Sequence, residues 1–190
     1  MHANRFTALL DANVLIPVLT RDLLLSLAEQ NLFRPRWSDE IMGEIRRNLP
    51  KVAALVSPQA AAKSVAAIES AFPDANVAGW ENIARGFTDL PDPGDAHVIA
   101  AAIRTSATVI VSDNRKHFPD TVLSPLGLEC LSADAFIADT LALDPGNGLQ
   151  AIDRMLARHS KPPQDYEALL RAMEAAMLPR SVEEIIAALG

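Results

Sequence analysis

The stretch TALLDANVLIP, residues 7–17, starts as an apolar segment and is then interrupted by polar residues. Ala8, Leu9 and Leu10 form the short apolar run that is typical of a buried β-strand. The run ends at Asp11, and Asn13 follows two residues later. A carboxylate beside a buried strand is costly unless a partner binds it. The stretch therefore predicts a strand over residues 7–10 with a bound carboxylate at its end.

The chain then alternates between short strands and helical stretches. The segment TVIVS, residues 108–112, is short and β-branched, as a buried strand of a parallel sheet should be. Ser38 is a suitable N-cap and Pro58 suits a first helical turn, whereas Pro50 predicts a helix end. Further strands are expected at residues 33–37 and 127–132, and helices at 14–30, 38–49, 58–72 and from Asp92 or Pro93 onward. This alternation predicts an α/β fold with a parallel sheet flanked by helices.

The sequence becomes entirely helical in character after about residue 134. Helices are expected at residues 133–142, 149–159, 162–177 and 181–190, with DPGNG as a separator after the first. Ser181 and Glu184 have the spacing of a capping box. We therefore expect an α/β domain over residues 1–137 and an all-helical C-terminal extension over residues 138–190.

Composition excludes several classes of protein. The 190 residues are 49% hydrophobic and carry a net charge of -7, which argues against nucleic-acid binding through a generally basic surface. Cys130 is the only cysteine, so neither an intrachain disulfide nor a cysteine-based zinc site can form. No apolar run reaches the length of a membrane span, and MHANRF, residues 1–6, lacks the apolar core of a signal peptide. A cytoplasmic protein with no membrane association is expected.

Four acidic residues lie at the ends or on the apolar sides of the expected elements. Asp11 and Asp113 each follow a strand, Glu44 flanks the apolar stripe of a helix, and Asp95 opens another helix. Ligands of open parallel sheets bind at the carboxyl ends of the strands. Clustered carboxylates repel one another unless a cation joins them, and oxygen ligands suit Mg²⁺ or Mn²⁺. The pattern predicts metal-assisted phosphodiester chemistry.

Each of these acids also has a purely structural interpretation. Asp11 could cap the following helix, Glu44 could be a solvated edge residue, and Asp113 could belong to a turn. Asp92 followed by a proline is typical of an N-cap, and a carboxylate at Asp95 would then be favoured by the helix dipole alone.

Four segments together resemble a known family. They are LLDANVLIP, WSDEIMGEIRRNL, DPGDAHVIAAAI and TVIVSDNRKHFP, in that order, and with their surroundings they cover residues 7–137. In this combination the chain resembles PIN-domain nucleases of the bacterial VapC-type toxin class, in a longer subgroup with a helical extension. The resemblance implies a parallel sheet with acids at its carboxyl edge. It also implies endoribonuclease activity that depends on Mg²⁺ or Mn²⁺, with the protein acting as the toxin of a toxin–antitoxin pair.

The resemblance assigns the site one residue at a time. Asp11 matches the first acid of the family, with Asn13 beside it, Glu44 matches the helix-borne glutamate, and Asp95 matches the acid that opens the next helix. Family members carry Thr-x-Asp or Thr-x-Asn at the last position. Here Ser112 takes the threonine place and Asn114 the last place, so Asp113 comes one residue early. Either Asp113 is the fourth carboxylate or Asn114 contributes its amide, and one or two metal ions fit accordingly.

Substrate and partner contacts follow from the same resemblance. Arg46, Arg47, Arg115 and Lys116 are placed to dock RNA phosphates, although each could equally be a solvated surface charge. Trp37 could stack on a base or belong to the core. The resemblance further implies a cognate antitoxin and permits a homodimer, and the helical extension could serve either of these or cover the RNA.

Three other functions fit parts of the sequence. One is a catalytically weak PIN-type domain that binds RNA or protein. Another is a phosphatase-like or response-regulator-like protein, but no second acid adjoins Asp11 and Lys116 lies in a short loop. The last is a helical adaptor, which the first half of the chain does not favour.

Overall fold

The computed structural model describes residues 6–52, 56–158 and 165–190. The chain forms two compact units, each described separately below. The sheet unit comprises Phe6–Ile16 and Arg34–Leu131. The helical unit comprises Pro17–Phe33 and Ser132–Gly190 among the described parts of the chain. The expected division between residues 137 and 138 stays a prediction.

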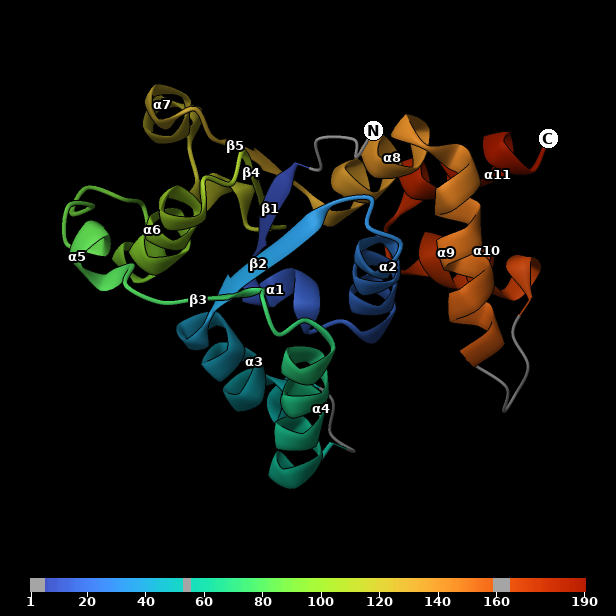
Figure 1. Cartoon of the computed structure of the whole chain (residues 1–190), viewed down its shortest axis with the longest axis horizontal. Coiled ribbons are helices and arrows are strands. Elements are labelled where there is room, and N and C mark those ends of the chain that lie inside the picture. Colours follow the sequence, from blue (N-terminus) through green and yellow to red (C-terminus); the bar gives the residue numbers. More distant parts are fainter. Residues whose placement is uncertain (1–5, 53–55, 159–164) are drawn as a thin grey trace. The chain divides into compact units, whose positions relative to one another are not determined.

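The sheet unit is built on five parallel strands in the order β3-β2-β1-β4-β5 (Figure 1). They are β1 (Thr7–Leu10), β2 (Arg34–Ser38), β3 (Asn76–Val77), β4 (Val109–Val111) and β5 (Glu129–Leu131). The strand predicted at residues 7–10 is therefore the central one, and Leu9 pairs with Arg36 on one side and Ile110 on the other. Ala8, Leu9 and Leu10 are fully buried. The parallel sheet flanked by helices that the sequence predicts is confirmed.

Helices cover the sheet where their apolar stripes meet it. Helix α3 buries Ile41 and Ile45 and packs on α4, while α6 packs on β1, β2 and β4 through an alanine-rich face that allows close approach. Ser106 adopts a left-handed conformation at the end of α6, which stops that helix. The helices are α1 (Ala12–Leu15), α3 (Asp39–Val52), α4 (Pro58–Ala71), α5 (Glu81–Ala84), α6 (Ala96–Thr105) and α7 (Asp120–Leu123), with 3₁₀ turns η1 (Pro93–Asp95), η2 (Arg115–His117) and η3 (Ser124–Leu126).

The helical unit joins one early helix to the C-terminal part of the chain. Its helices are α2 (Val18–Glu29), α8 (Ala133–Leu143), α9 (Pro145–Arg158), α10 (Tyr166–Ala175) and α11 (Pro179–Leu189). Helix α2 packs against α8 and α9, and α8 also packs against α11. Phe33 and Phe136 meet edge to face with their ring centroids 4.8 Å apart. The all-helical character of the C-terminal extension is confirmed, except that residues 159–164 of the expected helices lie outside the described residues.

Several boundaries differ from those expected. The helix predicted over residues 14–30 is interrupted at Pro17, which has no amide hydrogen, so it forms as α1 and α2. The predicted stop at Pro50 is wrong, because α3 continues through this proline to Val52. The cost is the one hydrogen bond that the Pro50 nitrogen cannot donate. The prediction that DPGNG separates two helices is correct only at Asp144, because α9 begins at the next residue, Pro145.

The capping box predicted for Ser181 and Glu184 does not form, because α11 begins earlier, at Pro179. The carboxylate of Asp134 in α8 caps this helix instead. It accepts hydrogen bonds from the backbone N–H groups of Arg180, at 3.1 Å, and Ser181, at 2.8 Å. The Ser181 hydroxyl lies 2.8 Å from the same carboxylate. This contact satisfies amide groups that a helix start otherwise leaves without partners.

None of the described helices has the length and apolar character of a membrane span. The cytoplasmic location expected from the sequence stays a prediction.

We predict that Asp134→Ala lowers the free energy of unfolding by about 1–2 kcal/mol, because it removes the cap of α11. Urea unfolding followed by circular dichroism measures the change. The matched control is Asp139→Ala on the same helix, which removes only the exposed ion pair between Asp139 and Arg180 and should cost about 0–1 kcal/mol. Equal losses in the two variants would show that the Asp134 cap adds nothing beyond an exposed charge contact.

Candidate functional site

The first acid of the site is Asp11, at the carboxyl end of the central strand. Its backbone N–H donates to the carbonyl of Val111 at 3.1 Å, which extends the pairing of β1 with β4 by one step. Its side chain is 5% exposed. One carboxylate oxygen accepts from the Ala12 N–H at 2.6 Å, and the other accepts from Asn13 Nδ2 at 2.6 Å and from the Ser112 hydroxyl at 2.7 Å. Asp11 thus caps α1, and it is also tied to the end of β4.

The residues after β4 are fixed to the same carboxylate. Ser112 Oγ accepts from Asn13 Nδ2 at 2.9 Å and from the Asn114 N–H at 3.2 Å. Asn13 Oδ1 accepts from the Asp113 N–H at 3.0 Å. The structure therefore brings together Asp11 and its three predicted supporting residues. Asp113 itself is exposed.

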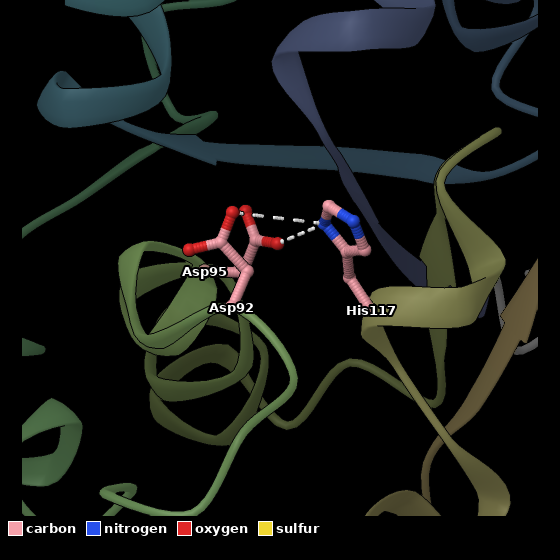
Figure 2. Close-up of side chains that lie close together, drawn as sticks. All are labelled: Asp92, Asp95 and His117. Carbon is pink, nitrogen blue, oxygen red and sulfur yellow. Dashed lines mark hydrogen bonds and ion pairs between the residues drawn. The ribbon is translucent and has the colours of Figure 1, made fainter.

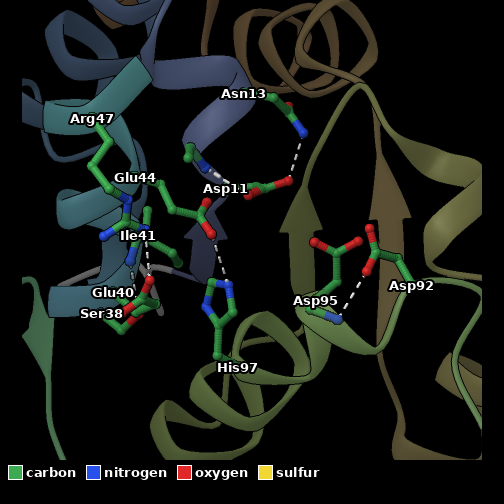
Figure 3. Close-up of polar contacts among 12 residues, drawn as sticks. Asp11, Asn13, Ser38, Glu40, Ile41, Glu44, Arg47, Asp92, Asp95 and His97 are labelled. Carbon is green, nitrogen blue, oxygen red and sulfur yellow. Dashed lines mark hydrogen bonds and ion pairs between the residues drawn. The ribbon is translucent and has the colours of Figure 1, made fainter. Parts of the chain in front are cut away.

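The helix-borne acid, Glu44, extends from α3 toward α6 (Figure 3). Its Oε1 lies 3.3 Å from His97 Nε2, and its side chain is 30% exposed whereas that of His97 is 8% exposed. Neither ring nitrogen of His97 makes a hydrogen bond of good geometry among the described residues. The contact is therefore best understood as an attraction between charges.

Asp95 lies where η1 runs into α6. Its Oδ2 is 2.7 Å from His117 Nδ1, and Asp92 Oδ2 is 3.9 Å from the same nitrogen (Figure 2). Asp92 is the N-cap of η1, as its position before a proline predicts, and accepts from the Gly94 N–H at 2.8 Å. Potential ligand atoms of Asp92, Asp95 and His117 all lie within 4.8 Å of one another, which is close enough for a shared metal ion.

The electrostatics of the site are those of acids held close together. Burial raises the pKa of Asp11 to about 6 against the hydrogen bonds from Ser112 and Ala12, and the charges of Asp95 and Glu44 add to the rise. Burial also raises the pKa of Asp95, although its hydrogen bond with His117 opposes this. Burial has the largest single effect on the pKa of His97 and lowers it. Glu44, Asp11 and Glu40 together raise the pKa by more than this, so the overall shift is upward.

The side chains of Asp11, Glu44 and Asp95 come from β1, α3 and the start of α6 toward one another (Figure 3). The negative charges of Glu44 and Asp95 are near enough to Asp11 to contribute to the rise in its pKa. In the arrangement described they do not form a group whose ligand atoms all lie within 4.8 Å, whereas Asp92, Asp95 and His117 do. Their role as joint metal ligands stays a prediction.

The predicted phosphate contacts and stacking residue differ in their surroundings. Arg46, Arg115 and Lys116 are exposed, and Arg47 forms a 2.7 Å ion pair with Glu40 on its own helix. Trp37 is fully buried and packs edge to face on Phe72, so of its two interpretations the core position is the one observed.

Two histidines were not among the predicted site residues. His97 contacts Glu44, and His117 contacts Asp95. The sequence does carry a signal for both, since His97 follows Asp95 by two residues and His117 follows the same strand as Ser112. Nothing in the local pattern indicates that the two rings turn toward the acids.

A family model described as the PIN domain matches residues 7–116, more than half of the chain. The chain belongs to the PIN domain family. The resemblance drawn from the sequence to VapC-type PIN proteins with a C-terminal extension is thereby confirmed, since a second model, described as the VapC50 C-terminal domain, matches residues 133–186.

Among curated proteins, the chain is 40% identical over 79 residues to "Putative ribonuclease VapC50" of Mycobacterium tuberculosis. The matched part covers 42% of this chain and 47% of that protein, so the similarity spans about half the length of the relative. No solved structure matches the chain. The PIN match includes all four predicted acids and ends one residue before His117.

We predict that Asp11→Asn changes how the stability of this PIN domain depends on pH. The carboxyl is neutral in both folded and unfolded states below its usual pKa of 3.8. As the pH rises toward about 6, the unfolded state loses this proton first, which favours unfolding. Between pH 4 and pH 7 the wild type should therefore lose about 2 kcal/mol of unfolding free energy that the variant does not lose.

Urea unfolding at pH 4, 5, 6 and 7, with EDTA present throughout, measures this difference. Asp74→Asn, at an exposed position of the same unit, controls for the loss of one negative charge. Parallel stability curves for the wild type and Asp11→Asn would contradict the buried, raised-pKa carboxyl.

Proposed function

We propose that this protein is a divalent-metal-dependent endoribonuclease and the toxin of a type II toxin–antitoxin pair. The observation that carries the proposal is geometric: Asp11, Glu44 and Asp95 extend from three separate elements toward one another at the carboxyl edge of the sheet (Figure 3). Acids that come together from separate elements repel one another, and a counter-charge lowers this repulsion. A divalent cation supplies that counter-charge.

The donor set fits a hard cation. Asp11, Glu44 and Asp95 offer carboxylate oxygens only, which is the chemistry that Mg²⁺ and Mn²⁺ prefer. Asp11 Oδ1 accepts one hydrogen bond and keeps a lone pair for a ligand bond, whereas Oδ2 already accepts two. A divalent ion bound there supplies Lewis-acid stabilisation of the phosphodiester and lowers the pKa of a bound water.

The remaining residues of the site orient the acids and the substrate. Ser112 and Asn13 hold the Asp11 carboxylate in place, so its position needs no rearrangement on binding. Arg46, Arg115 and Lys116 are exposed and available for RNA phosphates, while Arg47 would have to exchange its partner Glu40 for a phosphate. Cys130 is buried, and its pKa is raised by burial, which argues against a thiolate nucleophile.

Asp113 is our proposed fourth carboxylate. It directly follows Ser112 at the end of β4, its backbone N–H donates to Asn13, and its position is exposed. Asn114, whose N–H is bound by Ser112, is proposed as a supporting residue.

The RNA substrate is proposed from the relative's printed name. The matched protein of Mycobacterium tuberculosis is named as a ribonuclease, and the C-terminal match carries the name of the same protein. A cognate antitoxin, a homodimer and the cytoplasmic location remain predictions of the sequence.

We predict that the wild type cleaves single-stranded RNA in the presence of Mn²⁺ or Mg²⁺ and stops when EDTA is added. Asp11→Asn and Glu44→Gln should each reduce the cleavage rate by about 100-fold or more, which is the size of effect seen when one electrostatic stabiliser of a transition state is removed. Gel analysis of an end-labelled RNA over time measures the rate.

The control is Asp74→Asn, an exposed acid outside the site, which should cleave at the wild-type rate. Cleavage by Asp11→Asn at the wild-type rate would reject the site. If the wild type binds RNA without cutting it in any divalent ion, the protein is instead a PIN-type binding module.

We also predict that Asp113→Asn reduces cleavage by roughly 10-fold or more, and that Asn114→Ala has a smaller effect, because a charged ligand contributes more to divalent-ion binding than a neutral amide. Cleavage rates measured over a series of Mn²⁺ concentrations compare the two variants. The reverse order of effects would assign the fourth position to Asn114.

A further inference from the structure

Asp95 stands at a helix start but does not cap it. An aspartate at this position normally accepts a hydrogen bond from the second or third backbone N–H of the helix. The side chain of Asp95 makes no such bond with α6. The preceding turn is capped by Asp92, which leaves the Asp95 carboxylate free to point elsewhere. Because Asp95 does not cap α6, a different contact must orient its carboxylate.

His117 is that second partner. Its Nδ1 lies 2.7 Å from Asp95 Oδ2, a distance typical of a hydrogen bond between a nitrogen donor and a carboxylate (Figure 2). Both side chains are 22% exposed, so water competes only partly for the contact. Asp92 Oδ2 is farther from this nitrogen, at 3.9 Å.

The backbone that carries the imidazole is held by its turn. His117 closes the turn η2, in which its N–H donates to the Asn114 carbonyl at 2.8 Å and the Phe118 N–H donates to the Arg115 carbonyl at 3.0 Å. The next side chain, Phe118, is 2% exposed and anchors the turn in the core. The ring therefore reaches Asp95 from a backbone that has little freedom.

We propose that His117 is a positioning residue, which donates its Nδ1 hydrogen to Asp95 and keeps that carboxylate turned toward Asp11 and Glu44. This inference rests on the proposed function, because Asp95 is expected to act through a divalent ion. In this proposal, the segment after β4 orients two of the acids. Ser112 orients the acid of β1, and His117, five residues later, orients the acid that precedes α6. Outer partners of this kind set how well a carboxylate binds a metal.

The experiment compares the full-length wild type with His117→Ala and His117→Asn. The amide nitrogen of asparagine falls near the place of Nδ1 and can donate to Asp95, whereas alanine cannot. Mn²⁺ binding is measured by electron paramagnetic resonance without RNA, and kcat and KM for RNA cleavage are measured across Mn²⁺ concentrations. Circular dichroism verifies that each variant is folded.

We expect His117→Ala to weaken Mn²⁺ binding by about 10- to 100-fold, with a matching rise in the Mn²⁺ concentration needed for cleavage. The KM for RNA at saturating Mn²⁺ should not change, and His117→Asn should recover most of the lost affinity. Asp92→Asn, which keeps a side-chain oxygen for the Gly94 N–H, should weaken Mn²⁺ binding less than His117→Ala.

Other results overturn the proposal. Unchanged Mn²⁺ affinity in His117→Ala, or no recovery in His117→Asn, rejects a positioning role. Because Asp92, Asp95 and His117 are close enough to share an ion, direct ligation is tested too: nitrogen coupling to wild-type Mn²⁺ that disappears in His117→Ala would make His117 a ligand instead. Mn²⁺ binding without RNA cleavage would reject the nuclease alone, whereas absence of Mn²⁺ binding by the wild type would reject both proposals.

Discussion

The parallel pairing of β1 with β4 is the constraint on which the candidate site depends. The pairing sets Leu10 beside Val111, and the Asp11 N–H continues it by donating to the Val111 carbonyl. The residues that follow the two strands, Asp11 after β1 and Ser112 after β4, are both polar, and this register places them at the same edge of the sheet. This register brings Asp11 within 2.7 Å of Ser112, although the two are 101 residues apart in the sequence. A shift of one residue would turn the polar pair away and bury the wrong side chains.

The acids at this edge are stabilised by different kinds of partner. Asp11 is enclosed and receives three hydrogen bonds from neutral groups. Glu44 and Asp95 are more open, and each faces a histidine. Neutral donors keep the buried carboxylate in place without cancelling its charge. A cation that enters the site therefore still meets the charge of Asp11, and it also meets Glu44 and Asp95, which contact His97 and His117.

Much of the sheet could be predicted from sequence, because its strands are marked by local signals. The run before Asp11 is apolar and the run before Ser112 is β-branched, so both strands and the polar residues that follow them could be recognised. Strand β3 could not, since it has only two residues, and their strand conformation depends on pairing with Trp37 and Ser38. The family resemblance proposed the acids as candidates, but it did not predict the 2.7 Å contact between Asp95 and His117, which depends on how two side chains turn.

The helical unit shows a different limit of sequence reasoning. The glycines of DPGNG resemble a turn, yet α9 runs through them. A Cβ atom at Gly148 would lie 2.6 Å from Leu141 Cδ2, so this glycine is present because α8 and α9 approach closely. Glycine is used for close packing as well as for turns, and a single sequence does not separate the two uses.

The order of helices in the helical unit also governs how the nascent chain can fold. Helix α2 leaves the ribosome early, but its packing partners α8 and α9 begin only at residues 133 and 145. The apolar face of α2, which includes Leu23, Leu24 and Leu27, therefore stays without these packing partners until most of the chain has been synthesised. Long-range closure of this kind slows folding and leaves an exposed hydrophobic surface for chaperones to bind.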